Sequence, residues 1–138
     1  MLKHIPLSVP VFDGNENDFV FHAIESKQIS TAGNYINDFE DQIEDRLGKY
    51  NVALKNSGTS AIHLALKLIG VGSGDEVLCQ SFTFCASANP VIYLGAKPVF
   101  IDSEPTTLNI CPEILEQAML DTIKIGKQPK AIIVVDLF

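Results

Sequence analysis

The sequence predicts an α/β domain in which a largely parallel sheet is covered by helices on both faces. Two observations carry this prediction. From Asn51 onward, short apolar runs typical of strands alternate with longer runs that have helical spacing. Glycines then occur where the first two of these helices would end, at Gly70, Gly72 and Gly74 and again at Gly95. Such alternation is typical of strands joined by crossover helices.

The first 50 residues have a different pattern. They are expected to form an N-terminal arm with two helices, and residues 51–138 the first part of a large α/β domain, together one incomplete domain. Two prolines within residues 5–14 predict an extended arm. Helical spacing then predicts one helix over 15–26 and a second after a Gly33-Asn34 turn. The apolar stripe of the second helix consists of Ile36, Phe39, Ile43 and Leu47.

The second part contains four expected strands and three expected helices. Strands are predicted at 52–55, 76–80, 98–101 and 131–136, and helices at 59–69, about 84–94 and 112–121. The run from Ala131 to Val135 is the most apolar and is typical of a central strand. Because sheets of this class place ligand chemistry just beyond such strand ends, and the sequence stops at Phe138, we expect the chain to be a fragment.

The composition is that of a soluble globular protein, with 46% hydrophobic and 20% charged residues. A net charge of −7 without a basic cluster argues against nucleic acid or an anionic membrane as a partner. No apolar run is long enough to span a membrane and no signal-peptide pattern is present, so we expect a cytoplasmic protein. Three cysteines and three histidines lack metal-site spacing, which predicts buried free thiols and no bound metal.

The most informative local motif is the Asn-Ser-Gly-Thr-Ser-Ala turn at 56–61, between an expected strand and an expected helix. Such a turn directs unpaired backbone N–H groups and the positive end of a helix dipole at one spot, where a phosphate can bind. Gly58 has no Cβ to block close approach, and the hydroxyls of Ser57, Thr59 and Ser60 can donate further hydrogen bonds. The alternative is that Ser57 or Thr59 simply caps the helix.

Five motifs in order resemble one known family over almost the whole chain. They are Ile5-Pro6-Leu7-Ser8-Val9-Pro10, the turn at 56–61, Gly74-Asp75-Glu76-Val77-Leu78, Ser81-Phe82-Thr83-Phe84 and Gly95-Ala96-Lys97-Pro98-Val99-Phe100-Ile101-Asp102. This order and spacing resemble the DegT/DnrJ/EryC1/StrS family, although any one motif alone is weak. The resemblance implies an aminotransferase that uses pyridoxal 5′-phosphate (PLP), with the fold type I large domain built around a mostly parallel seven-stranded sheet.

The resemblance also implies roles for cofactor-binding residues. Gly58, Thr59 and Ser60 would bind the PLP phosphate through backbone N–H groups and hydroxyls. Phe84 would stack on the cofactor ring, because a flat side chain holds the pyridine plane at low entropic cost. The alternative for Phe84 is an ordinary core aromatic, which is the more common fate of a phenylalanine.

Substrate contacts are implied for Ser30 and Thr31, in a segment that lies near the substrate in such enzymes. Gln28 stands in the region where the family has an aromatic residue, which leaves the sugar preference open. Many members have histidine where this chain has Asp136, and the consequence of that exchange is also open.

Two groups that transamination requires have no counterpart in the sequence. One is the Schiff-base lysine, and the other is a carboxylate that pairs with the pyridine nitrogen. Family members carry both on later strands, so the lysine is expected beyond Phe138. Neither Lys55 nor Lys67 lies where the family places it. The chain alone is therefore expected to be inactive.

The leading hypothesis is a PLP-dependent aminotransferase that transfers an amino group from glutamate to a nucleotide-linked 4-keto-6-deoxy sugar in surface-glycan or related sugar biosynthesis. The resemblance further implies a homodimer, because fold type I active sites take residues from the partner subunit. Two alternatives are a PLP-dependent sugar dehydratase of the same family and a non-catalytic PLP- or phosphate-binding module. A dinucleotide-binding domain is disfavoured, because no G-x-G-x-x-G follows the first expected strand.

Overall fold

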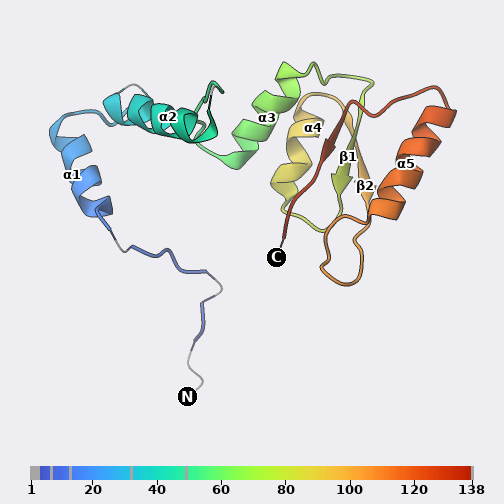
Figure 1. The fold of residues 1–138 in the computed structure, drawn as a ribbon, viewed down its shortest axis with the longest axis horizontal. Coiled ribbons are helices and arrows are strands. Elements are labelled where there is room, and N and C mark those ends of the chain that lie inside the picture. The colour runs from blue at the N-terminus through green and yellow to red at the C-terminus, as the bar shows by residue number, and fades with distance from the viewer. Residues whose placement is uncertain (1–3, 7, 13, 32, 49, 138) are drawn as a thin grey trace. The chain divides into compact units, whose positions relative to one another are not determined.

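The chain divides into two compact units, Met1–Leu54 and Lys55–Phe138. The computed structural model describes residues 4–6, 8–12, 14–31, 33–48 and 50–137, and Figure 1 labels their helices and strands.

The first unit contains the two expected helices, α1 (Glu16–Glu25) and α2 (Asn34–Leu47). Aromatic side chains connect them, since the rings of Phe19 and Tyr35 meet edge to face with centroids 5.9 Å apart. The Tyr35 hydroxyl also lies 2.6 Å from Nδ1 of His22. Residues 5–6 and 8–12 before α1 have no helix or strand, which agrees with the expected extended arm.

The strand expected at 52–55 is not formed. Residues 50–55 pair with no strand among the described residues. Instead, the N–H of Val52 donates to Oε1 of Glu44 at 2.7 Å, and the N–H of Leu54 donates to Oε1 of Glu40 at 2.7 Å. Residues four apart lie on one side of a helix, and alternate N–H groups of an extended segment point the same way. Two carboxylates of α2 therefore take the place of a strand partner.

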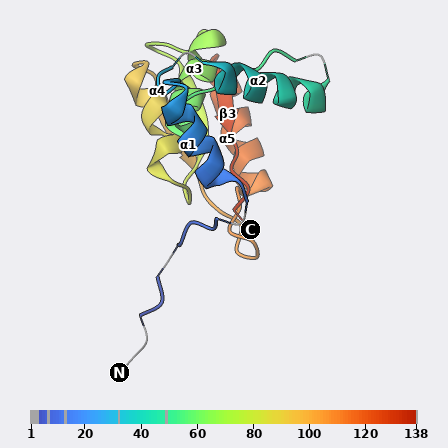
Figure 2. The same cartoon turned by 90° about the vertical axis from the view of Figure 1, so that its left-hand side faces the viewer.

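The second unit is a three-stranded parallel sheet with helices on both faces, which confirms the predicted α/β class. Figure 1 shows α3 and α4 on one side of the sheet and α5 on the other, and Figure 2 shows the same layers from the α3 side. The strand order is β2-β1-β3, so β1 is central. In chain order the elements are α3 (Gly58–Leu68), β1 (Glu76–Gln80), the 3₁₀ turn η1 (Cys85–Ser87), α4 (Asn89–Tyr93), β2 (Lys97–Ile101), α5 (Pro112–Lys124) and β3 (Ala131–Ile133).

Alternate residues of β1 face different neighbours. Val77 and Cys79 are fully buried and belong to the main apolar core together with Leu66 of α3 and Val91 of α4. Because successive strand residues point to opposite faces, Leu78 and Gln80 lie on the face that α5 covers. Both strands beside β1 are in register with it: Glu76 is opposite Lys97, Gln80 opposite Ile101, Val77 opposite Ala131 and Cys79 opposite Ile133.

Two further expectations need correction. The helix expected at about 84–94 is divided into η1 and α4, because Pro90 lacks an N–H and its ring disfavours a continuous helix through the preceding turn. The strand expected at 131–136 covers only Ala131–Ile133. It is an edge strand of the described sheet, with Ile132 41% exposed, and the central position belongs to β1.

Three of the predicted helix-ending glycines, Gly70, Gly74 and Gly95, have a positive φ, and two of them directly follow a helix. Gly70 has φ +75° after α3, and Gly95 has φ +75° after α4. Gly95 N–H donates to the carbonyl of Ile92 at 2.9 Å, which closes the end of α4.

Candidate functional site

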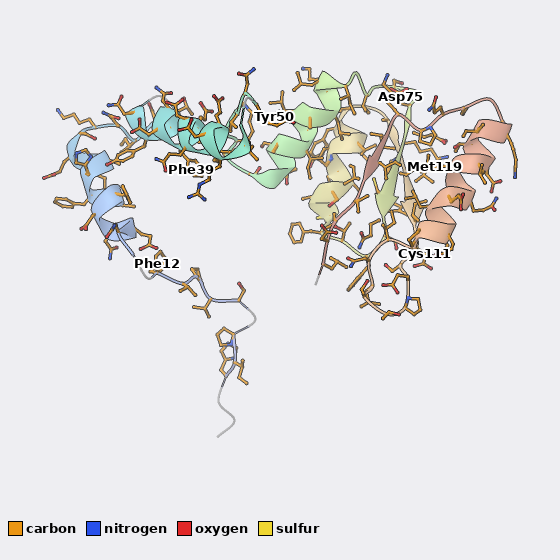
Figure 3. The ribbon with its side chains drawn as sticks, viewed as in Figure 1. Phe12, Phe39, Tyr50, Asp75, Cys111 and Met119 are labelled. Carbon is orange, nitrogen blue, oxygen red and sulfur yellow. The ribbon has the colours of Figure 1, made fainter. Side chains whose placement is uncertain are left out.

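The candidate site of the second unit lies at the edge of the sheet where the strands have their carboxyl ends. The strands run toward this edge and α3 runs the opposite way, so the N-terminus of α3 lies there too (Figure 1). In Figure 3, Asp75 before β1 and Cys111 before α5 mark the two opposite edges of the sheet. From β1 the chain reaches β2 through α4 on one face and then β3 through α5 on the other. Ligands of open α/β sheets bind at such divergence points.

The N-terminus of α3 is both capped and open. Ser57 is the N-cap, and its Oγ accepts a hydrogen bond from Ser60 N–H at 3.2 Å and lies 3.0 Å from Ser60 Oγ. Its carbonyl accepts from Ala61 N–H at 3.1 Å. The N–H groups of Gly58 and Thr59 have no acceptor among the residues described in the structure, as expected for the first turn of a helix. The capping and the anion-site interpretations of this turn are therefore compatible.

Packing within the described part of the chain does not require glycine at position 58. A Cβ built on it would meet no described atom within 4 Å, and its backbone is not in the left-handed region. Thr59 and Ser60 beside it are half-buried. Space at Gly58, two N–H groups without acceptors and neighbouring hydroxyls are the features of an anion site.

Phe84 lies on the surface of its unit. It is 79% exposed and extended, with φ −68° and ψ 138°, at the start of η1. Phe82 in the same segment is 52% exposed. Within the described residues, Phe84 therefore does not occupy the core position that the alternative interpretation requires.

Ser30 and Thr31 lie in the loop between α1 and α2 and are exposed. They belong to the first unit, whereas the residues at the start of α3 and Phe84 belong to the second. Gln28 shapes this loop, because its Oε1 accepts a hydrogen bond from Asn34 N–H, at the start of α2, at 2.8 Å. A Cβ at Gly33 would lie 3.2 Å from the Cβ of Gln28.

Sequence reasoning missed Gln80, the last residue of β1. Its side chain is fully buried, and its Nε2 donates to the carbonyl of Phe82 at 2.9 Å and to the carbonyl of Leu108 at 3.4 Å. Leu108 has φ +63°, uncommon for a residue with a side chain. A polar residue that ends an otherwise apolar strand was the available signal.

Glu104 shapes the loop between β2 and α5. Its carboxylate accepts hydrogen bonds from the Thr107 hydroxyl, from Thr106 N–H at 2.7 Å and from Thr107 N–H at 2.6 Å. Led by the Thr107 hydroxyl, these bonds lower the pKa of the Glu104 carboxyl to about 2. Glu104 is therefore an ionised turn-forming residue rather than a proton donor.

Asp75 and Glu76 lie at the opposite, amino edge of the sheet. Asp75 Oδ2 accepts a hydrogen bond from Gly72 N–H at 2.9 Å, and Glu76 Oε1 pairs with Lys97 Nζ at 3.0 Å. Both carboxylates are thus committed to local structure.

No helix among the described residues is both long and apolar enough to cross a membrane. No group of three or more His, Cys, Asp or Glu side chains in that part of the chain could hold a metal ion.

Comparison with known proteins identifies the family. Residues 10–138 match the DegT/DnrJ/EryC1/StrS aminotransferase family. The chain belongs to this family. EpsN of Bacillus subtilis (strain 168) is 48% identical over 138 residues, which are 100% of this chain and 36% of that protein. GDP-perosamine synthase of Caulobacter vibrioides is 41% identical over 137 residues, 99% of this chain and 35% of that enzyme. The chain thus spans about a third of the length of the curated relatives it matches.

Solved structures of family members have the same fold. A DegT/DnrJ/EryC1/StrS aminotransferase from Brucella abortus matches with a TM-score of 0.78 and 37% identity, over 89% of this chain and 34% of that one. NtdA from Bacillus subtilis, solved with bound pyridoxamine phosphate (PMP), matches with a TM-score of 0.72 and 30% identity, over 88% of this chain and 27% of that one. The family is PLP-dependent, as the motifs predicted.

The residues at the carboxyl edge of the sheet fit this cofactor. A phosphate dianion suits the start of α3, where the N–H groups of Gly58 and Thr59 lack acceptors in the described part of the chain and Gly58 has no Cβ. A flat heteroaromatic ring suits the exposed Phe84 side chain. When bound, PLP supplies an electron sink for reactions at an amino-bearing carbon.

Proposed function

We propose that this chain forms the phosphate- and ring-binding part of a PLP-dependent nucleotide-sugar aminotransferase. The observation that carries the proposal is the start of α3, where the N–H groups of Gly58 and Thr59 have no acceptor among the described residues and lie beside the Ser57–Ser60 hydroxyl pair. Gly58 and Thr59 donate these N–H groups to the phosphate, and the hydroxyls of Thr59 and Ser60 add further donors. Phe84 stacks on the pyridine ring and limits its tilt.

The substrate of the proposed reaction is a nucleotide-linked 4-keto-6-deoxy sugar, and the amino donor is glutamate. The similarity to a GDP-perosamine synthase supports this class of substrate. Ser30 and Thr31, on the exposed loop between α1 and α2, contact the sugar nucleotide. We place the protein in the cytoplasm as a homodimer, which sedimentation of the purified protein and cell fractionation would test.

The phosphate site is tested with PMP, because this amine does not condense with lysines as PLP does. Equilibrium dialysis would compare PMP with pyridoxamine, which lacks the phosphate, on the full protein that contains this chain. Gly58→Ala places a methyl group where the phosphate binds, so PMP affinity should fall by about 10- to 100-fold while pyridoxamine affinity changes little. Helix stability should not fall, since alanine favours a helix more than glycine does.

Gly72→Ala is the matched control. Gly72 is also outside the left-handed region, and a Cβ on it would also meet no described atom within 4 Å, but it lies at the amino edge of the sheet. This variant should bind PMP as the unaltered protein does. A folded Gly58→Ala protein with unchanged PMP affinity would disprove the phosphate assignment.

The reaction is tested by incubating the full protein with PLP, glutamate and a nucleotide-linked 4-keto-6-deoxy sugar. The proposal expects an amino sugar and 2-oxoglutarate in equal amounts. A product that has lost a hydroxyl without gaining nitrogen would instead indicate the dehydratase, and no turnover would favour a binding module.

We assign no catalytic lysine to residues 1–138 and propose that these residues alone are inactive. Reduction of the PLP-loaded full protein with borohydride, followed by peptide mass spectrometry, would locate the modified lysine. The label should lie outside this chain. A single stoichiometric label on a lysine such as Lys55 or Lys67 would overturn this assignment.

A further inference from the structure

Four consecutive residues after β1 have their backbone or side chain fixed by hydrogen bonds. Ser81 N–H donates to the carbonyl of Ile101 at 2.9 Å, which extends the pairing of β1 with β2 by one residue. Thr83 Oγ1 lies 3.0 Å from the buried Ser87 Oγ, and Ser87 N–H donates to the carbonyl of Phe84 at 2.9 Å. The remaining residue, Phe82, is held through its carbonyl by Gln80 alone among the described residues.

The same segment exposes its two large apolar rings. Phe82 is 52% and Phe84 79% exposed, although both follow the most buried strand of the unit. A rigid backbone that carries an exposed aromatic ring is preorganised for contact with a ligand, because little conformational freedom is then lost on binding. The hydrogen bonds around the segment therefore hold the backbone that carries these two exposed rings.

Gln80 connects this segment to a second loop. Its Nε2 donates at 2.9 Å to the Phe82 carbonyl and at 3.4 Å to the carbonyl of Leu108. Leu108 holds its left-handed φ of +63° in the loop between β2 and α5. One buried amide thus joins β1, the aromatic segment and this loop at the carboxyl edge of the sheet.

Apolar packing of the core alone does not explain glutamine at this position. Gln80 is 0% exposed, and its Oε1 has no hydrogen-bond partner among the described residues. A buried acceptor without a partner is unfavourable, and an apolar residue of similar volume would avoid that cost. What an apolar residue could not do is donate to the two carbonyls.

We propose that Gln80 is a positioning residue for the cofactor ring, acting through the Phe82 carbonyl to set the direction of Phe84. This inference rests on the proposed stacking role of Phe84 and extends it to a buried residue that does not touch the cofactor. Loss of the amide donor frees the Phe82 peptide, and the Phe84 ring then samples orientations that do not stack.

The test is a double-mutant cycle on PMP affinity, measured by equilibrium dialysis with the full protein. Gln80→Met removes the donor and keeps the length of the side chain, and Phe84→Ala removes the ring. Each single variant should weaken PMP binding by about tenfold. The double variant should bind no more weakly than Phe84→Ala, because the proposal has Gln80 act on the cofactor only through the Phe84 ring.

A merely structural role predicts a different result. In that case Gln80→Met weakens PMP binding by the same factor with and without Phe84, which would overturn the proposal. Unchanged affinity of Gln80→Met, with Phe84→Ala weakened, would also overturn it and leave the stacking role intact. Unchanged affinity of Phe84→Ala would instead overturn the stacking role itself, and this inference with it.

Two further variants keep the test interpretable. Gln117→Met on α5 removes another amide donor, which bonds Asp121 Oδ1 at 2.8 Å on the exposed surface, and it should leave PMP affinity unchanged. If Gln80→Met does not fold, Gln80→Asn replaces it in the cycle, because the shorter amide withdraws the donor from Phe82 but keeps a polar group. Urea unfolding of each variant would establish that it is folded.

Discussion

Asn109 Oδ1 accepts a hydrogen bond from the backbone N–H of Leu137 at 3.0 Å. This bond ties the loop between β2 and α5 to the segment that follows β3, across 28 residues of sequence. Asn109 Nδ2 donates to Thr107 Oγ1 at 3.0 Å, which fixes the amide within its own loop. Together with the Gln80 bonds, the contact links the carboxyl ends of β1 and β3 through one loop.

Asn109→Ala should therefore loosen the segment after β3. The Leu137 N–H loses its acceptor, and a lost hydrogen bond of this kind destabilises by about 1 kcal/mol. Hydrogen exchange of the Leu137 amide should become several-fold faster, by roughly the factor of 5 that 1 kcal/mol represents. Asn109→Asp keeps an acceptor oxygen and is the matched control, with exchange close to that of the unaltered protein. Equal protection in Asn109→Ala would show that the bond contributes nothing to this segment.

Glu104 predicts a pH dependence for the same loop. Its hydrogen bonds with Thr107 and Thr106 lower the pKa of the carboxyl from 4.5 to about 2. A carboxyl whose pKa is lower in the folded state stabilises that state above its unfolded pKa, and the contribution is lost as pH falls through the folded pKa. The difference in unfolding free energy between the unaltered protein and Glu104→Gln should be constant above about pH 5 and should shrink toward about pH 2.

Urea unfolding at a series of pH values measures this difference. Glu116→Gln, which removes an exposed carboxylate from α5, controls for the loss of one negative charge. A difference between the unaltered protein and Glu104→Gln that stays constant down to about pH 2 would contradict the lowered pKa.

Sequence patterns predicted the helices and strands whose formation depends mainly on residues nearby in the sequence. The helices α1, α2 and α5 have long apolar periodicity, and β1 and β2 are short apolar runs bounded by turns, so each lies close to its expected place. The start of α3 was also predictable, because the Ser57 hydroxyl caps the helix by accepting from the N–H of Ser60, only three residues away.

Elements that depend on distant partners were not predictable in this way. Residues 52–55 have the composition of a strand, but their N–H groups find carboxylates on α2 instead of a second strand. The apolar run at 131–135 predicted a central strand, but β3 lies at the edge of the described sheet and Ile132 is 41% exposed. Gln80 was missed for the same reason, since one of its acceptors, Leu108, is 28 residues away.

The cysteines should differ in reactivity. Cys79 on β1 is buried, and burial raises the pKa of its thiol to about 11, so almost no thiolate is present near neutral pH. Cys85, at the start of η1, is exposed, so the expectation of a buried thiol was wrong for this residue. Iodoacetamide under native conditions should alkylate Cys85 readily and leave Cys79 unmodified until the protein is unfolded in urea. Peptide mass spectrometry at several times would follow both sites, and native labelling of Cys79 at the rate of Cys85 would contradict its burial.

Glu40 and Glu44 should stabilise the first unit through the segment that follows α2. Each carboxylate accepts one backbone N–H, from Leu54 and Val52 respectively, at 2.7 Å in a partly buried position. Replacing either with alanine leaves that N–H without its acceptor and should lower the free energy of unfolding by about 1 kcal/mol. Glu40→Gln should lose less, because the amide oxygen still accepts the hydrogen bond, although without the charge.

Asp41→Ala, on the exposed side of the same helix, is the control for removing a carboxylate from α2 and should change stability little. Because Glu40 and Glu44 hold N–H groups two residues apart in one segment, their effects should be coupled. Once one bond is lost the segment detaches more easily, so the double alanine variant should lose less than the sum of the two single losses. Urea unfolding of the four proteins measures this coupling. Strict additivity would show that the two carboxylates act on Val52 and Leu54 independently.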